Sequence, residues 1–390
     1  MVTPFFLART PHIRFGSGVL SELSGLIESV GHNALILTGK SSFVKSPHWE
    51  RLQSELKDRR IDWFHHVIDR EPTPTMIDDC VLRHQQSGIQ VVVAIGGGSV
   101  LDAGKAVSAM LTCIHPIKHY LEGVGGHQPP GDRLPFIAVP TTAGTGSEAT
   151  KNAVLSEIGP QGFKKSLRHE NYVPDIALID PILVLDCPPA LTAASGMDAF
   201  TQLLESYVST QASRMTDALA EDGLKSIRTG LWAAFQDGHN LAAREHMAYA
   251  ALLSGITLAN AGLGLVHGFA SSVGAQIDVP HGALCGSLMG IANRITLQRI
   301  LTDPTRRVAL EKYARAGRIF ADAKEKSDTY YAVFLVELIE QWVEELGLPR
   351  LAQFGLTQVQ ISHIAAQTSL KNHPVELGQE EREEVLVGRL

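Results

Sequence analysis

Three side chains in the second half of the sequence have the chemistry of a metal site. His267 lies in the stretch between Glu245 and Asp278, which has no charged residue, and His281 follows a proline where a helix would begin. One histidine in an apolar helix usually indicates a neutral, hydrogen-bonded core residue, because burying an imidazolium is costly. Two histidines together with Asp198, all in a charge-poor region, favour a metal instead. Such a set of two histidines and one carboxylate suits Fe(II) and is also usable by Zn(II).

Two glycine-rich segments in the first half could bind a dinucleotide. GGGSVLDAGK (96–105) follows an expected strand and opens an expected helix, so its backbone amides and the helix N-terminus can face a phosphate. The alternative is a tight turn in which Ser99 caps the helix. PTTAGTGSE (140–148) follows another expected strand and offers the hydroxyls of Thr141, Thr142 and Thr145. Two such loops at the carboxyl ends of parallel strands meet where doubly wound sheets hold nucleotides, so the pair predicts a dinucleotide site.

Alternating strands and helices are expected to position these loops. The expected strands are residues 34–39, 62–69, 89–99, 134–142 and 173–181, and the expected helices between them are residues 48–60, 72–88 and 99–112. This alternation predicts βαβ units and a mostly parallel sheet. Helical periodicity then dominates the second half, most clearly in residues 192–209, 215–235, 243–260 and 328–347.

The change in pattern near residues 181–188 indicates a domain boundary. The sequence therefore predicts an α/β dinucleotide-binding domain with a parallel sheet over residues 1–183. An all-α metal-binding and catalytic domain is expected over residues 184–390. We find no repeat or low-complexity linker, so the two domains are expected to pack directly against each other.

Composition excludes several other classes of protein. The chain has 390 residues, of which 44% are hydrophobic and 19% charged, so it can bury a substantial core. Its net charge of −7 (34 basic against 41 acidic residues) argues against a nucleic-acid binder. Four cysteines without CxxC spacing predict reduced thiols in a cytoplasmic protein. The uncharged stretch that ends before Asp278 is expected to be a buried helix pair rather than a membrane span.

The chain resembles the iron-containing (group III) alcohol dehydrogenase family, which has a dehydroquinate-synthase-like fold. The matching segments are the two glycine-rich loops described above together with PPALTAASGMDAF (188–200), GLGLVHG (262–268) and DVPHG (278–282). They occur in order along most of the chain. The resemblance implies NADP(H) or NAD(H) in the first domain and one divalent metal in the second, with Fe(II) favoured and Zn(II) as the alternative. It also implies a cleft between the two domains where a small alcohol and its aldehyde or ketone interconvert, and a homo-oligomer, a dimer or larger.

The resemblance also assigns roles to individual residues. Gly97, Gly98 and Ser99 are expected to hold the pyrophosphate, and Asp102 is expected near the nicotinamide. The remaining cofactor residues implied by the family are Thr141, Thr142, Thr145 and, with an uncertain register next to Lys165, Lys164. The family's four metal ligands fall on Asp198, Gln202, His267 and His281.

Two of these pocket positions depart from the family pattern. Gln202 stands where the family usually has a histidine ligand, and Ser271 stands where it has a second pocket histidine. Asp198 and Gln202 are four residues apart on one helix, so they share a face. The glutamine could ligate the metal weakly through its amide oxygen, or it could donate its amide hydrogens to the substrate oxygen.

The end of the second strand bears on cofactor choice. Many relatives that prefer NAD carry an acid there, which repels a 2′-phosphate and bonds the ribose hydroxyl. This chain has Gly39 at that position, followed by Lys40, Ser41 and Ser42, which could hold a 2′-phosphate. The segment therefore favours NADP(H), and the alternative is a solvated turn without a cofactor preference.

The expected reaction is hydride transfer between the alcohol and the nicotinamide, with the metal acting as a Lewis acid. Three alternatives stay open at this point. One is a reductase similar to maleylacetate reductases, with weak or no metal dependence, which Gln202 would fit. Another is a non-catalytic NAD(P)-binding sensor. Dehydroquinate synthase shares the fold, but the loop sequences match the dehydrogenases better.

Overall fold

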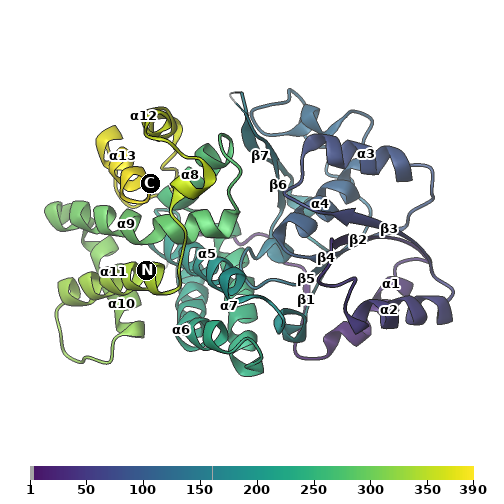
Figure 1. The fold of residues 1–390 in the computed structure, drawn as a ribbon, viewed down its shortest axis with the longest axis horizontal. Coiled ribbons are helices and arrows are strands. Elements are labelled where there is room, and N and C mark those ends of the chain that lie inside the picture. The colour runs from purple at the N-terminus through teal and green to yellow at the C-terminus, as the bar shows by residue number, and fades with distance from the viewer. Residues whose placement is uncertain (1–3, 160) are drawn as a thin grey trace.

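The computed structural model describes residues 4–159 and 161–390, and it consists of an α/β half followed by a helical half (Figure 1). A six-stranded sheet with the order β1-β8-β5-β4-β2-β3 forms the centre of the first half, and all its paired strands are parallel. Its strands are β1 (His12–Phe15), β2 (Asn33–Gly39), β3 (Asp62–Ile68), β4 (Val91–Gly96), β5 (Phe136–Pro140) and β8 (Ile176–Ile179). The fold class expected from the sequence is confirmed.

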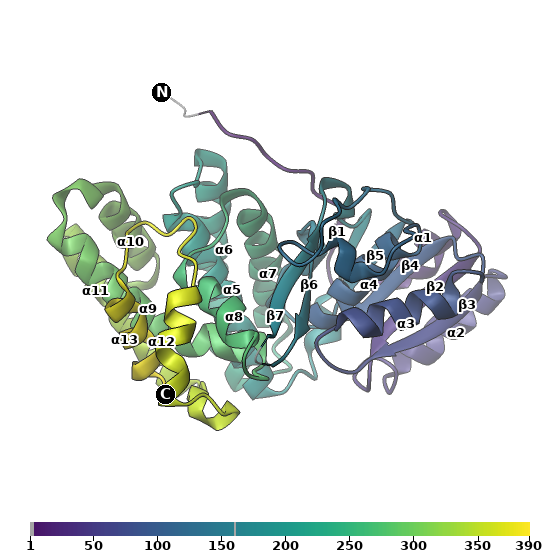
Figure 2. The same ribbon diagram turned by 90° about the horizontal axis from the view of Figure 1, so that it is seen from above.

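Helices cover both faces of this sheet. Strand β4 is buried along its whole length, so its β-branched side chains alternate between two apolar layers. Helices α1 (Leu23–Glu28) and α2 (Pro47–Asp58) cover one face, where they pack against Val91, Val93 and Ile95 of β4. Helices α3 (Pro74–His84) and α4 (Gly98–Met110) cover the other face, against the alternate residues Val92 and Ala94. The result is a three-layer arrangement whose strands β4 and β5 end at the two glycine-rich loops (Figure 2).

The sequence pattern did not predict two parts of this half. Strand β1 is four residues long and exposed throughout, so it has no buried alternation to detect. Strands β6 (Asn152–Glu157) and β7 (Phe163–Arg168) form a separate antiparallel hairpin. In β6 only Ala153, Leu155 and Ser156 are buried, and in β7, which contains two lysines, only Leu167 is buried, so neither strand gives an alternation long enough to indicate it.

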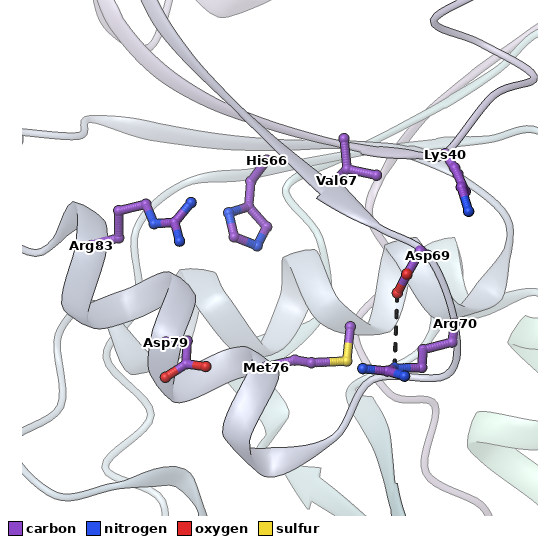
Figure 3. A pocket seen from close by; sticks show the side chains of 8 residues that line it. All are labelled: Lys40, His66, Val67, Asp69, Arg70, Met76, Asp79 and Arg83. Carbon is purple, nitrogen blue, oxygen red and sulfur yellow. Dashed lines mark ion pairs between the residues drawn. The ribbon is translucent and has the colours of Figure 1, made fainter.

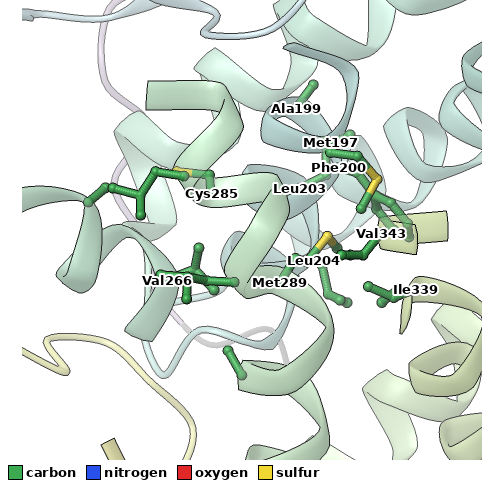
Figure 4. Close-up of a cluster of buried hydrophobic side chains, with 14 of the residues drawn as sticks. Met197, Ala199, Phe200, Leu203, Leu204, Val266, Cys285, Met289, Ile339 and Val343 are labelled. Carbon is green, nitrogen blue, oxygen red and sulfur yellow. The ribbon is translucent and has the colours of Figure 1, made fainter. Parts of the chain in front are cut away.

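The second half consists of helices packed on one apolar core. They are α5 (Pro189–Val208), α6 (Arg214–Gln236), α7 (Leu241–Ala261), α8 (Leu265–Gly274), α9 (His281–Thr302), α10 (Arg307–Phe320), α11 (Asp328–Glu345), α12 (Gln358–Gln367) and α13 (Gln379–Gly388). Helices α5 and α9 lie at its centre, where Phe200 and Met289 belong to the same buried cluster (Figure 4). The sheet ends at Ile179 and α5 begins at Pro189, on either side of the expected boundary.

No single helix in residues 4–159 and 161–390 is long and apolar enough to cross a membrane. Helices α7 and α8 pass such a test only as a pair, and a bend of 93° separates them. Most residues of both helices are buried in the core of the helical half, which accounts for the uncharged stretch in the sequence.

Candidate functional site

The structure brings together three of the residues expected to bind metal. Asp198 comes from α5, His267 from α8 and His281 from the first position of α9. The Asp198 Oδ1 atom lies 3.4 Å from His267 Nε2 and 3.6 Å from His281 Nε2. This oxygen is buried and has no hydrogen-bond partner among the described residues. A buried carboxylate oxygen without a partner, facing two imidazole nitrogens, fits a site for a cation.

Gln202 is placed differently from the other three. Its amide nitrogen donates to Asp198 Oδ2 at 3.1 Å, and its amide oxygen accepts from Ser254 Oγ of α7 at 2.7 Å. A carboxylate can only accept hydrogen bonds here, so it fixes which side of the amide faces Asp198. Ser254 Oγ also lies 3.4 Å from the carbonyl oxygen of Gly144. Gln202 thus connects the acid of the metal site to the second glycine-rich loop.

Two further side chains at this site were missed by the sequence analysis. Cys285, one turn after His281 on α9, places its sulfur 3.8 Å from the Nε2 atoms of both histidines. Glu205 of α5 accepts a hydrogen bond from His267 Nδ1 at 2.8 Å and another from the backbone nitrogen of Val266 at 2.7 Å. Both could have been found from helical spacing, because residues four and seven apart on a helix lie on one face.

The charges of these groups depend on one another. Burial alone would raise the pKa of Asp198, but the facing imidazoles of His281 and His267 outweigh it and lower that pKa. Burial likewise opposes ionisation of Cys285, yet His267 and His281 lower the pKa of its thiol below the ordinary value. The pKa of Glu205 is also lowered despite its burial, chiefly by its hydrogen bond to His267. The site is thus a buried cluster of acidic and imidazole groups whose ionised forms stabilise one another.

The two glycine-rich loops lie against each other at the ends of β4 and β5. An added Cβ at Gly97 would lie 3.3 Å from Thr142, and one at Gly98 would lie only 2.6 Å from Thr145. Contact between the loops therefore requires a glycine at Gly98 unless Thr145 shifts, and it leaves little room at Gly97, whatever ligand the loops hold. Gly97 caps α4 and Ser99 lies in its first turn, so the alternative in which Ser99 is the N-cap is wrong.

The two loops are joined by a buried lysine that the sequence analysis did not single out. Lys105 of α4 is fully buried, and its ammonium group donates to Ser147 O at 2.9 Å, Thr150 Oγ1 at 3.0 Å and Asn152 O at 2.8 Å. Burial lowers its pKa to about 8. Asp102, expected near the nicotinamide, accepts from Ser147 Oγ at 2.5 Å. These bonds fix the spacing between α4 and the loop that follows β5.

Lys164, expected to reach the cofactor ribose, lies on β7. Its ammonium group donates to both carboxylate oxygens of Glu71 at 2.8 Å. Glu71 also accepts from Ser156 Oγ at 2.9 Å, so this ion pair ties the hairpin to the loop before α3. The assignment of Lys164 to the ribose stays a prediction.

A charged pocket lies where β2 and β3 end, bordered by α3 (Figure 3). It is lined by Lys40, His66, Val67, Asp69, Arg70, Met76, Asp79 and Arg83. Arg70 pairs with Asp69 at 3.8 Å, and the Lys40 side chain projects from the end of β2 on the same side. The sequence analysis expected a phosphate-binding role for Lys40 but did not place an arginine beside it.

His66 belongs to a second group of potential metal donors, with Cys80 and His84 of α3. This group has three members. Burial raises the pKa of the Cys80 thiol to about 12, which disfavours the thiolate form that binds a metal. The first cluster also has the more favourable donor set, because it includes a carboxylate.

Comparison with known proteins agrees with this geometry. Family models match residues 10–181 (iron-containing alcohol dehydrogenase) and residues 192–386 (the C-terminal part of the Fe-containing alcohol dehydrogenase family). The chain is 36% identical over 288 residues to the probable alcohol dehydrogenase EutG of Escherichia coli (strain K12), across 74% of this chain and 68% of that protein. It is 33% identical over 350 residues to the 1-propanol dehydrogenase PduQ of Citrobacter freundii, across 86% and 84%. The crystal structure of a 1,3-propanediol oxidoreductase superposes with a TM-score of 0.88 at 26% identity and covers all of both chains.

Proposed function

The chain belongs to the iron-containing alcohol dehydrogenase family, as the sequence motifs predicted, and we propose that it interconverts a short primary alcohol and its aldehyde with NADP(H). It is an oxidoreductase that acts on CH–OH groups. The observation that carries the proposal is the convergence of Asp198, His267 and His281 from three helices. The choice of a short primary alcohol rests on the names of relatives that act on 1-propanol and 1,3-propanediol.

The protein's own part in this reaction is to hold and orient the reacting groups. When bound, the metal supplies Lewis acidity toward the substrate oxygen and the dinucleotide supplies or accepts the hydride. Glu205 accepts from Nδ1 of His267, so Nε2 of His267, on the side of Asp198, would be the nitrogen that binds the metal. The side chain of His281 is 27% exposed, whereas that of Asp198 is 1% exposed. The substrate therefore approaches from the side of His281.

The cofactor site is proposed at the loops that follow β4 and β5. Gly97, Gly98 and Ser99 at the start of α4 present backbone amides to the pyrophosphate, while Thr141, Thr142 and Thr145 line the second loop. Support for NADP(H) comes from the end of β2, where Gly39 leaves no acid to meet a ribose hydroxyl. Lys40 and Arg70 at the adjacent pocket provide positive charge for a 2′-phosphate.

Turnover of a series of short aldehydes with NADPH tests the proposed reaction. The wild-type protein, supplied anaerobically with a divalent metal, is expected to oxidise NADPH in proportion to the aldehyde consumed. Asp198→Asn should lose this activity and its bound metal while it still binds NADPH. The matched control is Asp222→Asn on α6, whose carboxylate bonds Tyr249 outside the site and should be dispensable. Wild-type turnover that survives complete chelation of metal would instead support the metal-independent reductase.

Cofactor choice can be tested at Gly39 without steric complication. An added Cβ there would have only ordinary contact, 3.9 Å from Val100. Gly39→Asp is expected to lower kcat/KM for NADPH by at least tenfold and to raise the relative preference for NADH, because the new carboxylate repels the 2′-phosphate. Lys40→Ala should weaken NADPH alone. Equal use of both dinucleotides by the wild-type protein would contradict the proposal.

Three further expectations complete the proposal. We propose residues 1–183 and 184–390 as the two domains. A homo-oligomer stays a prediction from the family, to be measured by light scattering. The cytoplasmic location stays a prediction from cysteine usage, and all four cysteines are unpaired in the structure.

A further inference from the structure

We propose that Cys285 is the fourth protein ligand of the metal, in the place that Gln202 would otherwise take, and that its thiolate increases the preference of the site for Zn(II) over Fe(II). This inference rests on the proposed function only in placing a divalent metal among Asp198, His267 and His281. It concerns what this chain uses as its fourth donor and which metal that donor selects.

The spacing of the four donor atoms fits a single tetrahedral ion. With bonds of about 2.1 Å from metal to nitrogen or oxygen and about 2.3 Å from metal to sulfur, such an ion has nitrogen–oxygen edges of about 3.4 Å and nitrogen–sulfur edges of about 3.6 Å. Asp198 Oδ1 lies 3.4 and 3.6 Å from the two Nε2 atoms. Cys285 Sγ lies 3.8 Å from each of the same two atoms. These four of the six edges agree to within a few tenths of an ångström, and all four donor atoms lie within 4.8 Å of one another.

Gln202 is not available for the same role. Its amide oxygen already accepts from Ser254 Oγ, and its amide nitrogen, which cannot ligate a metal, faces Asp198. Turning the amide over would set its oxygen against the Asp198 carboxylate and its nitrogen against Ser254. Gln202 is thus a positioning residue that holds Asp198 Oδ2 while Oδ1 remains directed at the two histidines.

The ordinary explanation for Cys285 is a buried core residue. Its side chain is indeed fully buried and borders the apolar cluster of α5 and α9 (Figure 4). A hydrogen bond from the single thiol proton accounts for only one of its two 3.8 Å contacts with imidazole nitrogens, whereas a shared metal ion accounts for both contacts and for the unpartnered carboxylate oxygen beside them. The helix accounts for this placement, since His281 and Cys285 are one turn apart on the same face of α9.

A thiolate ligand changes the chemistry of the site. Binding releases the thiol proton to solvent and leaves two anionic donors, Asp198 and Cys285, which together neutralise the charge of a divalent ion. A histidine or glutamine in the fourth position would leave one positive charge. Thiolate sulfur is also a soft donor, which suits Zn(II) better than an all-nitrogen and oxygen set does. The chain is therefore expected to discriminate between Zn(II) and Fe(II) more strongly than a protein without this cysteine.

Cobalt substitution tests the sulfur ligand without any measurement of turnover. Metal-free protein titrated with Co(II) is expected to develop a sulfur-to-cobalt charge-transfer band in the near ultraviolet at one equivalent. Cys285→Ser should lose this band and bind Co(II) about 100-fold more weakly or worse. Removing even a residue that only supports a ligand lowers metal affinity by up to about 100-fold. Gln202→Ala should keep the band. The matched control is Cys80→Ser, in the second donor group with His66 and His84, which should also keep it.

X-ray absorption at the zinc edge on wild-type protein provides a measurement that needs no variant. We expect one sulfur neighbour at about 2.3 Å. Anaerobic competition should give a Zn(II)-to-Fe(II) affinity ratio that falls in Cys285→Ser. Absence of a sulfur neighbour, or a cobalt band that disappears in Cys80→Ser and persists in Cys285→Ser, would overturn the proposal. Neither outcome depends on whether the protein turns over an aldehyde, so this inference and the proposed function fail separately.

Discussion

Glu205 offers the sharpest test of how the site is held together. Its two carboxylate oxygens accept from His267 Nδ1 at 2.8 Å and from the Val266 backbone nitrogen at 2.7 Å. Glu205→Gln keeps the shape of the side chain but leaves one oxygen for two donors, because the other atom becomes an amide NH₂. Losing such an outer partner typically lowers metal affinity by about 10- to 100-fold, equivalent to about 1.4–2.7 kcal/mol. The donor left unpaired costs a further 1–3 kcal/mol, roughly, of folding stability.

The assay is a chelator competition for Zn(II) together with urea unfolding of the metal-free protein. Glu221→Gln is the matched control, since Glu221 also accepts a short hydrogen bond from a buried side chain, Tyr207, but lies on α6 away from the donors. The control should keep wild-type metal affinity. If Glu205→Gln binds Zn(II) within twofold of the wild-type protein, the carboxylate does not orient His267 and the reasoning is refuted.

Three other perturbations follow from buried groups. Burial raises the pKa of Glu148 from 4.5 to about 7, so between these pH values the folded protein holds a proton that the unfolded chain releases, and stability falls as pH rises. The free energy of unfolding should fall by about 3 kcal/mol over this range, and Glu148→Gln should not show the fall. Urea unfolding of both proteins from pH 5 to 7.5 measures it, and a constant difference in stability between them would contradict the prediction. Gly98→Ala, whose Cβ would lie 2.6 Å from Thr145, should lower the free energy of unfolding by about 1–3 kcal/mol, and adding Thr145→Ala should recover part of that loss. Strictly additive effects in a double-mutant cycle would show that the two loops do not touch. Phe200→Ala, which removes a ring stacked 5.1 Å from Phe320, should lower the free energy of unfolding by about 3–5 kcal/mol, and a loss below 1 kcal/mol in calorimetry would show that this core is loosely packed.

Elements with strong periodicity could be predicted from the sequence, and weak ones could not. The run of valines in β4 is buried on both faces, and the scarcity of charged residues in α5 reflects burial of sixteen of its twenty residues. Strand β1 is exposed, and the hairpin of β6 and β7 gains its place from contacts with α4 and α8 rather than from its own pattern. Contacts of this kind between distant segments leave no periodic signal in the sequence.

The glycine-rich loops show a similar limit. Their composition was attributed to the approach of a phosphate, and this role stays a prediction. The structure adds a second cause, because Gly98 and Thr145 come from different loops and contact each other. Lys105 was part of the matched motif, yet its role in joining α4 to the second loop depends on carbonyl groups far along the chain. The motif therefore contained Lys105, but its hydrogen-bond partners became known only from the structure.

The metal donors show most clearly that contacts between distant segments cannot be read from the sequence. Comparison with the family pattern shows that Gln202 stands in place of a histidine ligand. A position-by-position comparison shows no more than the absence of that imidazole. It cannot show that another donor replaces it, since the replacement lies on a different helix. The packing of α5 against α9 supplies the missing information by bringing Cys285 to the two imidazoles that Asp198 also faces. The spacing rule that paired Asp198 with Gln202 applies equally to His281 and Cys285, so the sequence held the clue. Only the fold shows that the two pairs belong to one site.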